Sequence, residues 1–204
     1  MNRRVLLGAA CAATVLLLLV VGAAIRPLFF SEKATVTPVL TPTEIGFVQD
    51  MTGHHQQALV LVERLATDVD PTVRRVADQI ADAQRLEIGT MLGWLRLAAA
   101  TPTNPQPMSW MPTGHHTSAA SSTMPGMATR ADLDALARAR GADAEMMFLR
   151  LMYRHHQGGV AMAQTFDELS DGGPVEQAAR DMVSTQSQES GIIGLLMSQR
   201  AATS

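Results

Sequence analysis

Three features are scarce in this chain of 204 residues. Cysteine occurs once, as Cys11 inside an apolar N-terminal run, so the rest of the chain has neither a disulfide framework nor a thiolate metal site. Aromatic residues make up only 4% of the sequence, which favours packed helices over sheets. The 16 basic and 19 acidic residues include no basic run longer than a pair, so the positive surface that nucleic acids require is missing. These absences predict an all-α protein that does not bind nucleic acid.

The longest apolar run is at the N-terminus. Residues 5–25 are uncharged and follow two arginines, and the run is long enough for a membrane helix, which needs about 20 residues. Because basic residues stay on the cytoplasmic side, we predict a single-pass cell-membrane anchor over residues 1–26, with its N-terminus inside and the remainder outside the cytoplasm. A tether over residues 27–43 follows. The small residues at positions 22–24 leave a cleaved signal peptide, and therefore a secreted protein, as the alternative.

The rest of the sequence contains one helical pattern twice. The pattern comprises Phe47, Met51, His54 and His55 in the first copy and Phe148, Met152, His155 and His156 in the second. Each copy continues into a second amphipathic helix, so we predict helical hairpins over residues 44–99 and 142–199, joined by a crossover over residues 100–141 that is rich in Met and His. Neither hairpin can bury its apolar face alone, which predicts a four-helix bundle.

Four motifs in this order resemble the domain of unknown function 305 family over residues 44–197. The motifs are Phe47-x-x-x-Met51-x-x-His54-His55-x-x-Ala58, Gln84-x-x-Glu87-Ile88-x-x-Met91-x-x-Trp94-Leu95, Met124-x-Gly126-Met127-Ala128-Thr129 and Phe148-Leu149-x-x-Met152-x-x-His155-His156-x-Gly158. The resemblance implies a ferritin-like four-helix bundle, an extracytoplasmic location and an association with copper. The sequence departs from the family pattern at Tyr153 and at Ser190, which weakens any expectation that both halves bind identically.

The six histidines occur only as three adjacent pairs. In both hairpins a methionine lies three residues before the pair, so Met51 with His54 and His55, and Met152 with His155 and His156, each form a patch on one helix face. Imidazole with thioether favours copper, as Cu⁺ or Cu²⁺, over harder ions. Glu87 and Glu189 lie on inward stripes, so a mixed site with carboxylate ligands, holding zinc or iron, stays open. The alternative is that these histidines are ordinary bundle residues and the methionines plain core.

Two further groups are weaker candidates. Asp50, four residues before His54, is placed to orient an imidazole. The crossover contains a second possible set of copper ligands. It comprises Met108, Met111, His115, His116, Met124 and Met127. The alternative for the crossover is a solvated linker that docks Met124 and Met127 on the bundle.

These patterns predict an extracytoplasmic protein that binds a metal ion and sequesters or transfers copper, and they favour a binding protein over an enzyme. They do not identify a protein partner. One alternative is a ferritin-like metal-dependent oxidoreductase, although methionine stands where its Glu-x-x-His motifs need glutamate. The other is a non-catalytic module that docks on a membrane complex. The sequence contains no motif of a hydrolase or a nucleotide-binding enzyme.

Overall fold

The structure is a computed structural model that describes residues 13–22, 25, 39–111 and 124–202. Residues 1–37 and 38–204 form separate units. In the first unit, residues 13–22 form a helix whose apolar side chains over positions 15–21 are exposed. None of the helices in the described part of the chain has the length and hydropathy that a membrane crossing requires. Much of the predicted anchor lies outside the described residues.

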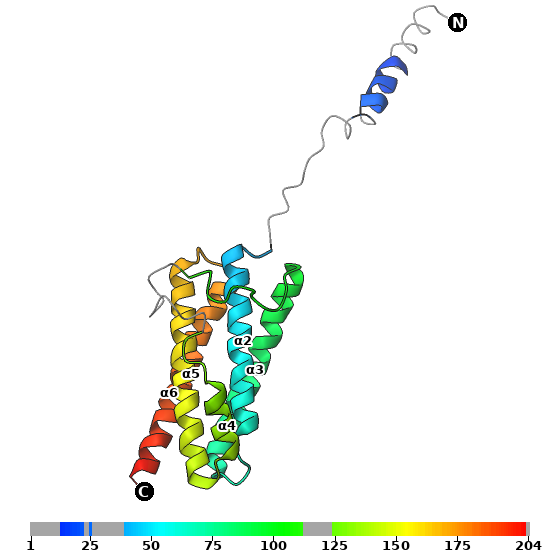
Figure 1. Cartoon of the computed structure of the whole chain (residues 1–204). Helices are drawn as coiled ribbons and strands as arrows, with labels where there is room; N and C mark the ends of the chain where they lie inside the picture. Colours follow the sequence, from blue (N-terminus) through cyan, green and yellow to red (C-terminus); the bar gives the residue numbers. More distant parts are fainter. Residues whose placement is uncertain (1–12, 23–24, 26–38, 112–123, 203–204) are drawn as a thin grey trace, which may run out of the picture. The chain divides into compact units, whose positions relative to one another are not determined.

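Four long helices and one short helix make up the second unit (Figure 1). They are α2 (Pro42–Arg64), α3 (Pro71–Leu97), α4 (Arg130–Arg138), α5 (Gly141–Leu169) and α6 (Pro174–Ala201). The chain pairs α2 with α3 and α5 with α6, and the two hairpins meet along α2 and α5, with α4 against both. The described residues include no strand. The prediction of an all-α helical bundle is therefore confirmed.

The helix ends follow from local side-chain chemistry. Thr41 caps α2 in a reciprocal capping box with Glu44, and Thr129 caps α4 in the same way with Asp132. The short helix α4 ends at Arg138, and Gly141 is the first residue of α5. Its φ of 51° is a left-handed backbone angle that glycine adopts without steric cost, which lets the chain turn directly from α4 into α5.

The bundle buries two apolar clusters, one toward each end. The first contains Leu61, Ile80, Leu149, Met152 and Ile193 among its members. The second, which we call the methionine cluster, contains Met51, Met91, Met108, Met111, Met162 and Met182 around Phe47 and Phe166. The rings of Phe47 and Phe166 stack with their centroids 4.1 Å apart, which joins α2 to α5 at this end. The four bundle histidines lie between the clusters along α2 and α5.

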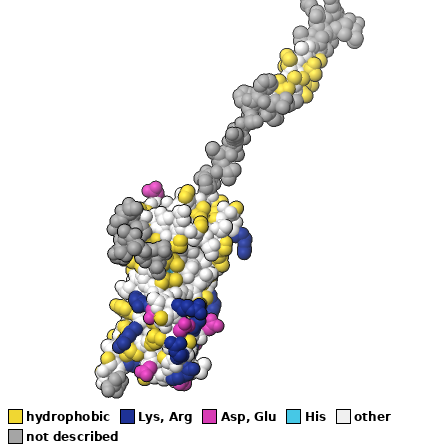
Figure 2. All heavy atoms as spheres, in the orientation of Figure 1, with side chains coloured by type: hydrophobic (Ala, Val, Ile, Leu, Met, Phe, Trp, Pro, Cys, Tyr) yellow, Lys and Arg dark blue, Asp and Glu magenta, His cyan; other side chains and the backbone are white. Residues whose placement is uncertain are grey.

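Charged side chains are distributed unevenly over the second unit. On the face shown in Figure 2 they gather over the half of the bundle near α4, and none of the described histidines is visible. The ion pairs Arg64–Asp134 and Arg154–Asp132 contribute to this charged region. Each is exposed enough to contribute at most about 1 kcal/mol to stability.

Candidate metal centre

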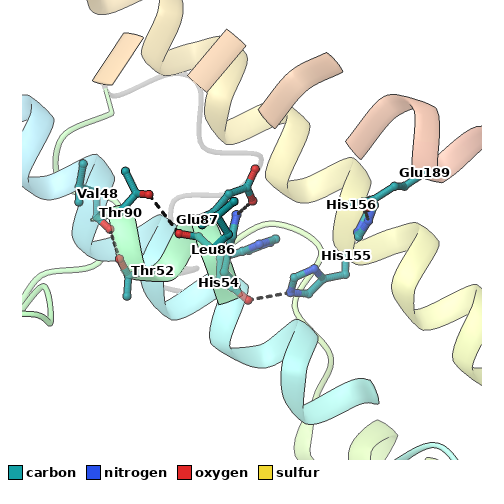
Figure 3. Close-up of polar contacts among 10 residues, drawn as sticks. Val48, Thr52, His54, Leu86, Glu87, Thr90, His155, His156 and Glu189 are labelled. Atoms are coloured by element: carbon teal, nitrogen blue, oxygen red, sulfur yellow. Dashed lines mark hydrogen bonds and ion pairs between the residues drawn. The ribbon is translucent and has the colours of Figure 1, made fainter. Parts of the chain in front are cut away.

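Two of the four bundle histidines meet where the hairpins touch. The other two point away from this contact, each toward the second helix of its own hairpin. The rings of His54 on α2 and His155 on α5 have centroids 3.8 Å apart and an interplanar angle of 34°. Adjacent residues on a helix point about 100° apart, so His55 faces Glu87 of α3. His156 faces Glu189 of α6 (Figure 3). All four side chains are buried, with at most 1% of any residue exposed. The repeated sequence thus places four imidazoles in one layer of the core.

Every bundle histidine has an oxygen partner at Nε2. His55 Nε2 lies 2.7 Å from Glu87 Oε2, and His156 Nε2 lies 2.7 Å from Glu189 Oε2. His54 Nε2 lies 3.0 Å from the carbonyl of Pro125, and His155 Nε2 lies 3.0 Å from the carbonyl of His54. Because carbonyl and carboxylate oxygens only accept, each Nε2 carries the hydrogen and donates it. The other nitrogen, Nδ1, then holds a free lone pair in each neutral ring.

None of the four Nδ1 atoms has a hydrogen-bond partner, and all four are buried. A buried acceptor without a partner costs roughly 1–3 kcal/mol. Burial lowers the pKa of His54 to about 3, and the neighbouring His55 contributes to the decrease. Burial likewise holds the pKa of His155 well below its usual value of 6.5. His54 and His155 are therefore neutral at physiological pH, which is the form of imidazole that binds a metal ion.

This arrangement has the chemistry of a metal centre. Metal-binding histidines commonly donate their other ring N–H to a carboxylate or a backbone carbonyl, which fixes the tautomer and orients the ring. Glu87 and Glu189 serve the outer pair of rings in this way, and backbone carbonyls serve the inner pair. Neutral imidazole nitrogen is a ligand that suits copper, zinc, iron and nickel. Within the residues that the structure describes, no three or more His, Cys, Asp or Glu side chains are grouped so that they could hold one ion.

A backbone segment, residues 124–128, covers His54. Gln57 fixes the segment by donating from Nε2 to the Ala128 carbonyl and accepting from the Ala128 N–H. Glycines make the contact possible, because a Cβ at Gly158 would lie 2.1 Å from the Pro125 oxygen and a Cβ at Gly126 would lie 2.4 Å from the Arg154 oxygen. We call residues 124–128 the strap. It packs directly on α5 and supplies the carbonyl that orients His54.

The two methionines that precede the histidine pairs are separated. Met51 is fully buried in the methionine cluster, whereas Met152 is fully buried in the other cluster. Both have apolar neighbours, so packing accounts for their positions. Glu87 and Glu189, predicted as weaker ligands, contact the outer imidazoles. Their role as direct metal ligands stays a prediction.

Asp50 has contacts that differ from its predicted role. Its Oδ2 accepts hydrogen bonds from the Met108 backbone N–H, from Trp110 Nε1 and from Asn104 Nδ2, at 2.7, 2.9 and 3.1 Å. Desolvation by burial raises its pKa, an effect that these three bonds oppose. Asp50 therefore binds the first part of the crossover to α2, and it orients none of the four bundle histidines, whose ring nitrogens have other partners or none.

The crossover candidates fall into three groups. Met108 and Met111 are buried, 3% and 8% exposed, in the methionine cluster, so they are core residues and not free ligands. Met124 and Met127 are partly buried at the strap, where Met124 packs on the methionine cluster. His115 and His116 lie outside the described residues, and their role as metal ligands stays a prediction.

One group of the centre, a backbone carbonyl, was not predicted from the sequence. The Pro125 carbonyl has no side-chain signal, although the Met-x-Gly-Met motif around it and the glycine at 158 mark an unusually close backbone contact. Gln186 is 1% exposed, and neither of its amide atoms has a partner. Its side chain occupies the space beside Gly159, where a Cβ would lie 2.4 Å from Oε1. Gln84, at the matching position of the first hairpin, also has an unpartnered buried Oε1.

The fold and this centre define a class of helical bundle with a buried layer of paired histidines. The chain belongs to the family described as domain of unknown function (DUF305), which matches residues 44–194. This confirms the resemblance seen in the sequence. A comparison with curated proteins finds no match.

Solved structures of the same architecture include two family members. One is a candidate secreted DUF305 protein from Streptomyces coelicolor, with 37% identity, a TM-score of 0.70 and coverage of 78% of this chain and 92% of that chain. Another is a DUF305 fragment from Deinococcus radiodurans, with 34% identity, a TM-score of 0.64 and coverage of 78% and 97%. CopM in its Cu(I)-bound form shares the fold at 24% identity, with a TM-score of 0.59 and coverage of 76% and 96%.

Proposed function

We propose that this protein binds copper outside the cytoplasm through its four bundle histidines and sequesters or transfers the ion. The observation that carries the proposal is the set of four buried Nδ1 atoms without partners, on rings whose Nε2–H groups are already engaged. An apolar core without a ligand would gain stability by losing these imidazoles. A bound metal ion would explain why both hairpins keep buried imidazoles.

Copper is the metal that the ligands favour. Neutral imidazole binds Cu, Zn and Fe, and among divalent ions the Irving–Williams order ranks Cu²⁺ first. Zinc and iron remain competitors for the same nitrogens. The Cu(I)-bound and Cu(II)-bound forms of CopM, a protein of the same fold, support copper over both.

A ferritin-like oxidoreductase has less support. Such a site needs carboxylates that bridge metal ions. Glu87 and Glu189 each contact an imidazole, and the residues three positions before His54 and His155 are methionines packed in the core. A non-catalytic module that docks on a membrane complex has no contact in the described residues to support it.

The location outside the cytoplasm rests on the N-terminal run. We propose that residues 1–26 anchor the protein in the cell membrane, with secretion after cleavage as the alternative. The apolar side chains exposed over positions 15–21 support this proposal, because both a membrane anchor and a signal peptide need such a segment. Membrane fractionation of cells that express the full chain tests the anchor; protein recovered only in the medium would support cleavage.

Metal titration tests the proposed function. In a parent variant, His115→Ala/His116→Ala, the crossover histidines are removed so that only the bundle is measured. We expect this parent to retain copper through gel filtration. The further replacement of His54, His55, His155 and His156 by Ala abolishes that retention, while far-UV circular dichroism monitors the helices. Equal copper in the two proteins would reject the bundle site. Parallel titrations with Zn²⁺ and Fe²⁺ establish the metal preference.

A further inference from the structure

We propose that one end of the bundle rests on the surface of the lipid bilayer in which the chain is anchored. This surface, which we call the uncharged end, consists of residues 39–43 and 97–111, at the start of α2 and the end of α3 (Figure 1). The inference rests on the proposed membrane anchor. It adds a second contact with lipid and the orientation of the bundle.

The uncharged end contains no Asp, Glu, Lys or Arg in either of its segments. Arg96 precedes the second segment, and the next charged residue along the chain is Arg130. Glu44 follows the first segment, and its Oε2 accepts a hydrogen bond from the Thr41 backbone N–H. On the face shown in Figure 2, the charged side chains gather over the other half of the bundle. Removing the uncharged end from water therefore desolvates no charged side chain of its own.

Large apolar side chains are exposed at this end. Leu97 is 70% exposed and Val39 is 60% exposed. The two tryptophans of the chain, Trp94 and Trp110, adjoin them and are partly buried against the methionine cluster. Tryptophan is enriched where a membrane meets water, because its ring is apolar and its N–H is polar. The composition of this end therefore suits the interfacial region of a bilayer.

Contacts with α2 hold the uncharged end in a fixed shape. Gln49 donates a hydrogen bond to the Thr101 carbonyl at 2.7 Å, and Asp50 accepts one from the Met108 N–H at 2.7 Å. Ala99 and Met108 have φ angles of 53° and 65°, which residues other than glycine rarely adopt. The contacts with α2 keep the chain in these bends. A surface that is shaped in advance loses less conformational entropy when it binds.

The chain itself keeps this end near the bilayer. Residues 27–38 separate the proposed anchor from the uncharged end, and even when fully extended they span at most about 40 Å. A surface held within that distance has a roughly millimolar effective concentration, so a weak contact is enough. A stable protein interface needs roughly 20–30 residues on each side, more than these two segments expose, because several of their residues are buried. The observations therefore favour lipid over a protein partner.

The neighbouring residues limit the contact and indicate the kind of lipid. Glu168 and Asp171 are exposed beside the loop between α5 and α6, so this side of the bundle remains in water. Arg96 is exposed in the last turn of α3, where its charged group can reach a lipid phosphate while its stem stays on apolar surface. Burial of apolar side chains therefore drives the contact, and a zwitterionic lipid is sufficient.

Tryptophan quenching tests the inference in the full-length chain. The protein is reconstituted into vesicles of phosphatidylcholine, or of phosphatidylcholine brominated near the headgroup end of its acyl chains, and flotation measures its attachment. We expect the brominated lipid to quench tryptophan emission in the unmutated protein. Val39→Glu/Leu97→Glu should abolish the quenching, because each glutamate lowers the ratio of docked to free bundle by about tenfold.

Leu86→Glu is the matched control and should retain the quenching. Leu86 is 74% exposed on the same helix, about 16 Å from Leu97 along its axis. Far-UV circular dichroism monitors the helices of both variants, and the comparison of the two lipids in the unmutated protein does not depend on either variant.

Three results would overturn the inference. Chains that float with the vesicles but remain unquenched would reject the contact and leave the anchor intact. Chains that do not float would reject the anchor, and the contact with it. Unquenched tryptophans in a dimer that Val39→Glu/Leu97→Glu dissociates in detergent would assign this end to a second copy of the chain.

Discussion

Replacing Gly158 by alanine should disrupt the contact between the strap and α5. A Cβ at this position would lie 2.1 Å from the Pro125 oxygen, 2.4 Å from its carbonyl carbon and 2.7 Å from the Gly126 nitrogen. All three are backbone atoms, so the strap must move. Overpacking of this kind costs about 1–3 kcal/mol, and the buried His54 Nε2–H, deprived of the Pro125 carbonyl, costs about 1–3 kcal/mol more.

Helix propensity opposes these losses by about 1 kcal/mol, because alanine is the better helix former. The net loss is about 1–5 kcal/mol in the free energy of unfolding. At roughly 2–4 °C per kcal/mol for a domain of this size, Tm should fall by about 2–20 °C.

Thermal unfolding of the metal-free protein, followed by circular dichroism, measures this change. Gly89→Ala is the matched control, because Gly89 is an exposed mid-helix residue of α3 whose Cβ would have nothing within 4 Å. The control should gain about 0.5–1 kcal/mol. If Gly158→Ala proves as harmless as Gly89→Ala, the close contact between strap and helix is refuted.

Three further outcomes are expected. Asp50→Ala leaves the buried Met108 N–H without its acceptor, so the free energy of unfolding should fall by about 2–3 kcal/mol. Trp110 also loses its acceptor, so tryptophan fluorescence should shift to the red. Unchanged fluorescence would contradict this. Gln186→Met replaces two unpartnered amide atoms with an apolar chain, so the metal-free protein should be equally stable or more stable by about 1 kcal/mol, and a clear loss would indicate an unseen partner. Acid should destabilise the metal-free protein: unfolded His54 takes up a proton near pH 6.5, whereas folded His54 does so only near pH 3. The free energy of unfolding should therefore be highest above about pH 6.5 and should fall by about 1 kcal/mol per pH unit between there and about pH 3. His155, whose pKa is also lowered, adds to this decrease. Urea denaturation measures it, and a constant free energy of unfolding between pH 7 and 4 would contradict the expectation.

Local periodicity was sufficient to predict the helices and the layer of histidines. Their spacing, repeated in two hairpins, placed the pairs on or beside the apolar faces, and the structure buries all four. The Asp50 prediction failed because it used only the spacing to His54 on the same helix. The atoms that engage Asp50 come from residues 104–110, and no local pattern shows where such a loop docks. Met108 and Met111 were assigned to an open crossover for the same reason. The hydrogen bond from His54 to the Pro125 carbonyl could not be predicted, because every residue has a backbone carbonyl and the sequence does not show which one will be near.

The absence of a Cβ at Gly159 makes the two halves of the bundle chemically unequal. The amide of Gln186 occupies the space beside this glycine, whereas the matching position of the first hairpin carries the methyl group of Ala58. A methyl group added at residue 159 would displace this amide, whereas the first hairpin already accommodates one, so the repeated hairpins do not tolerate the same substitutions.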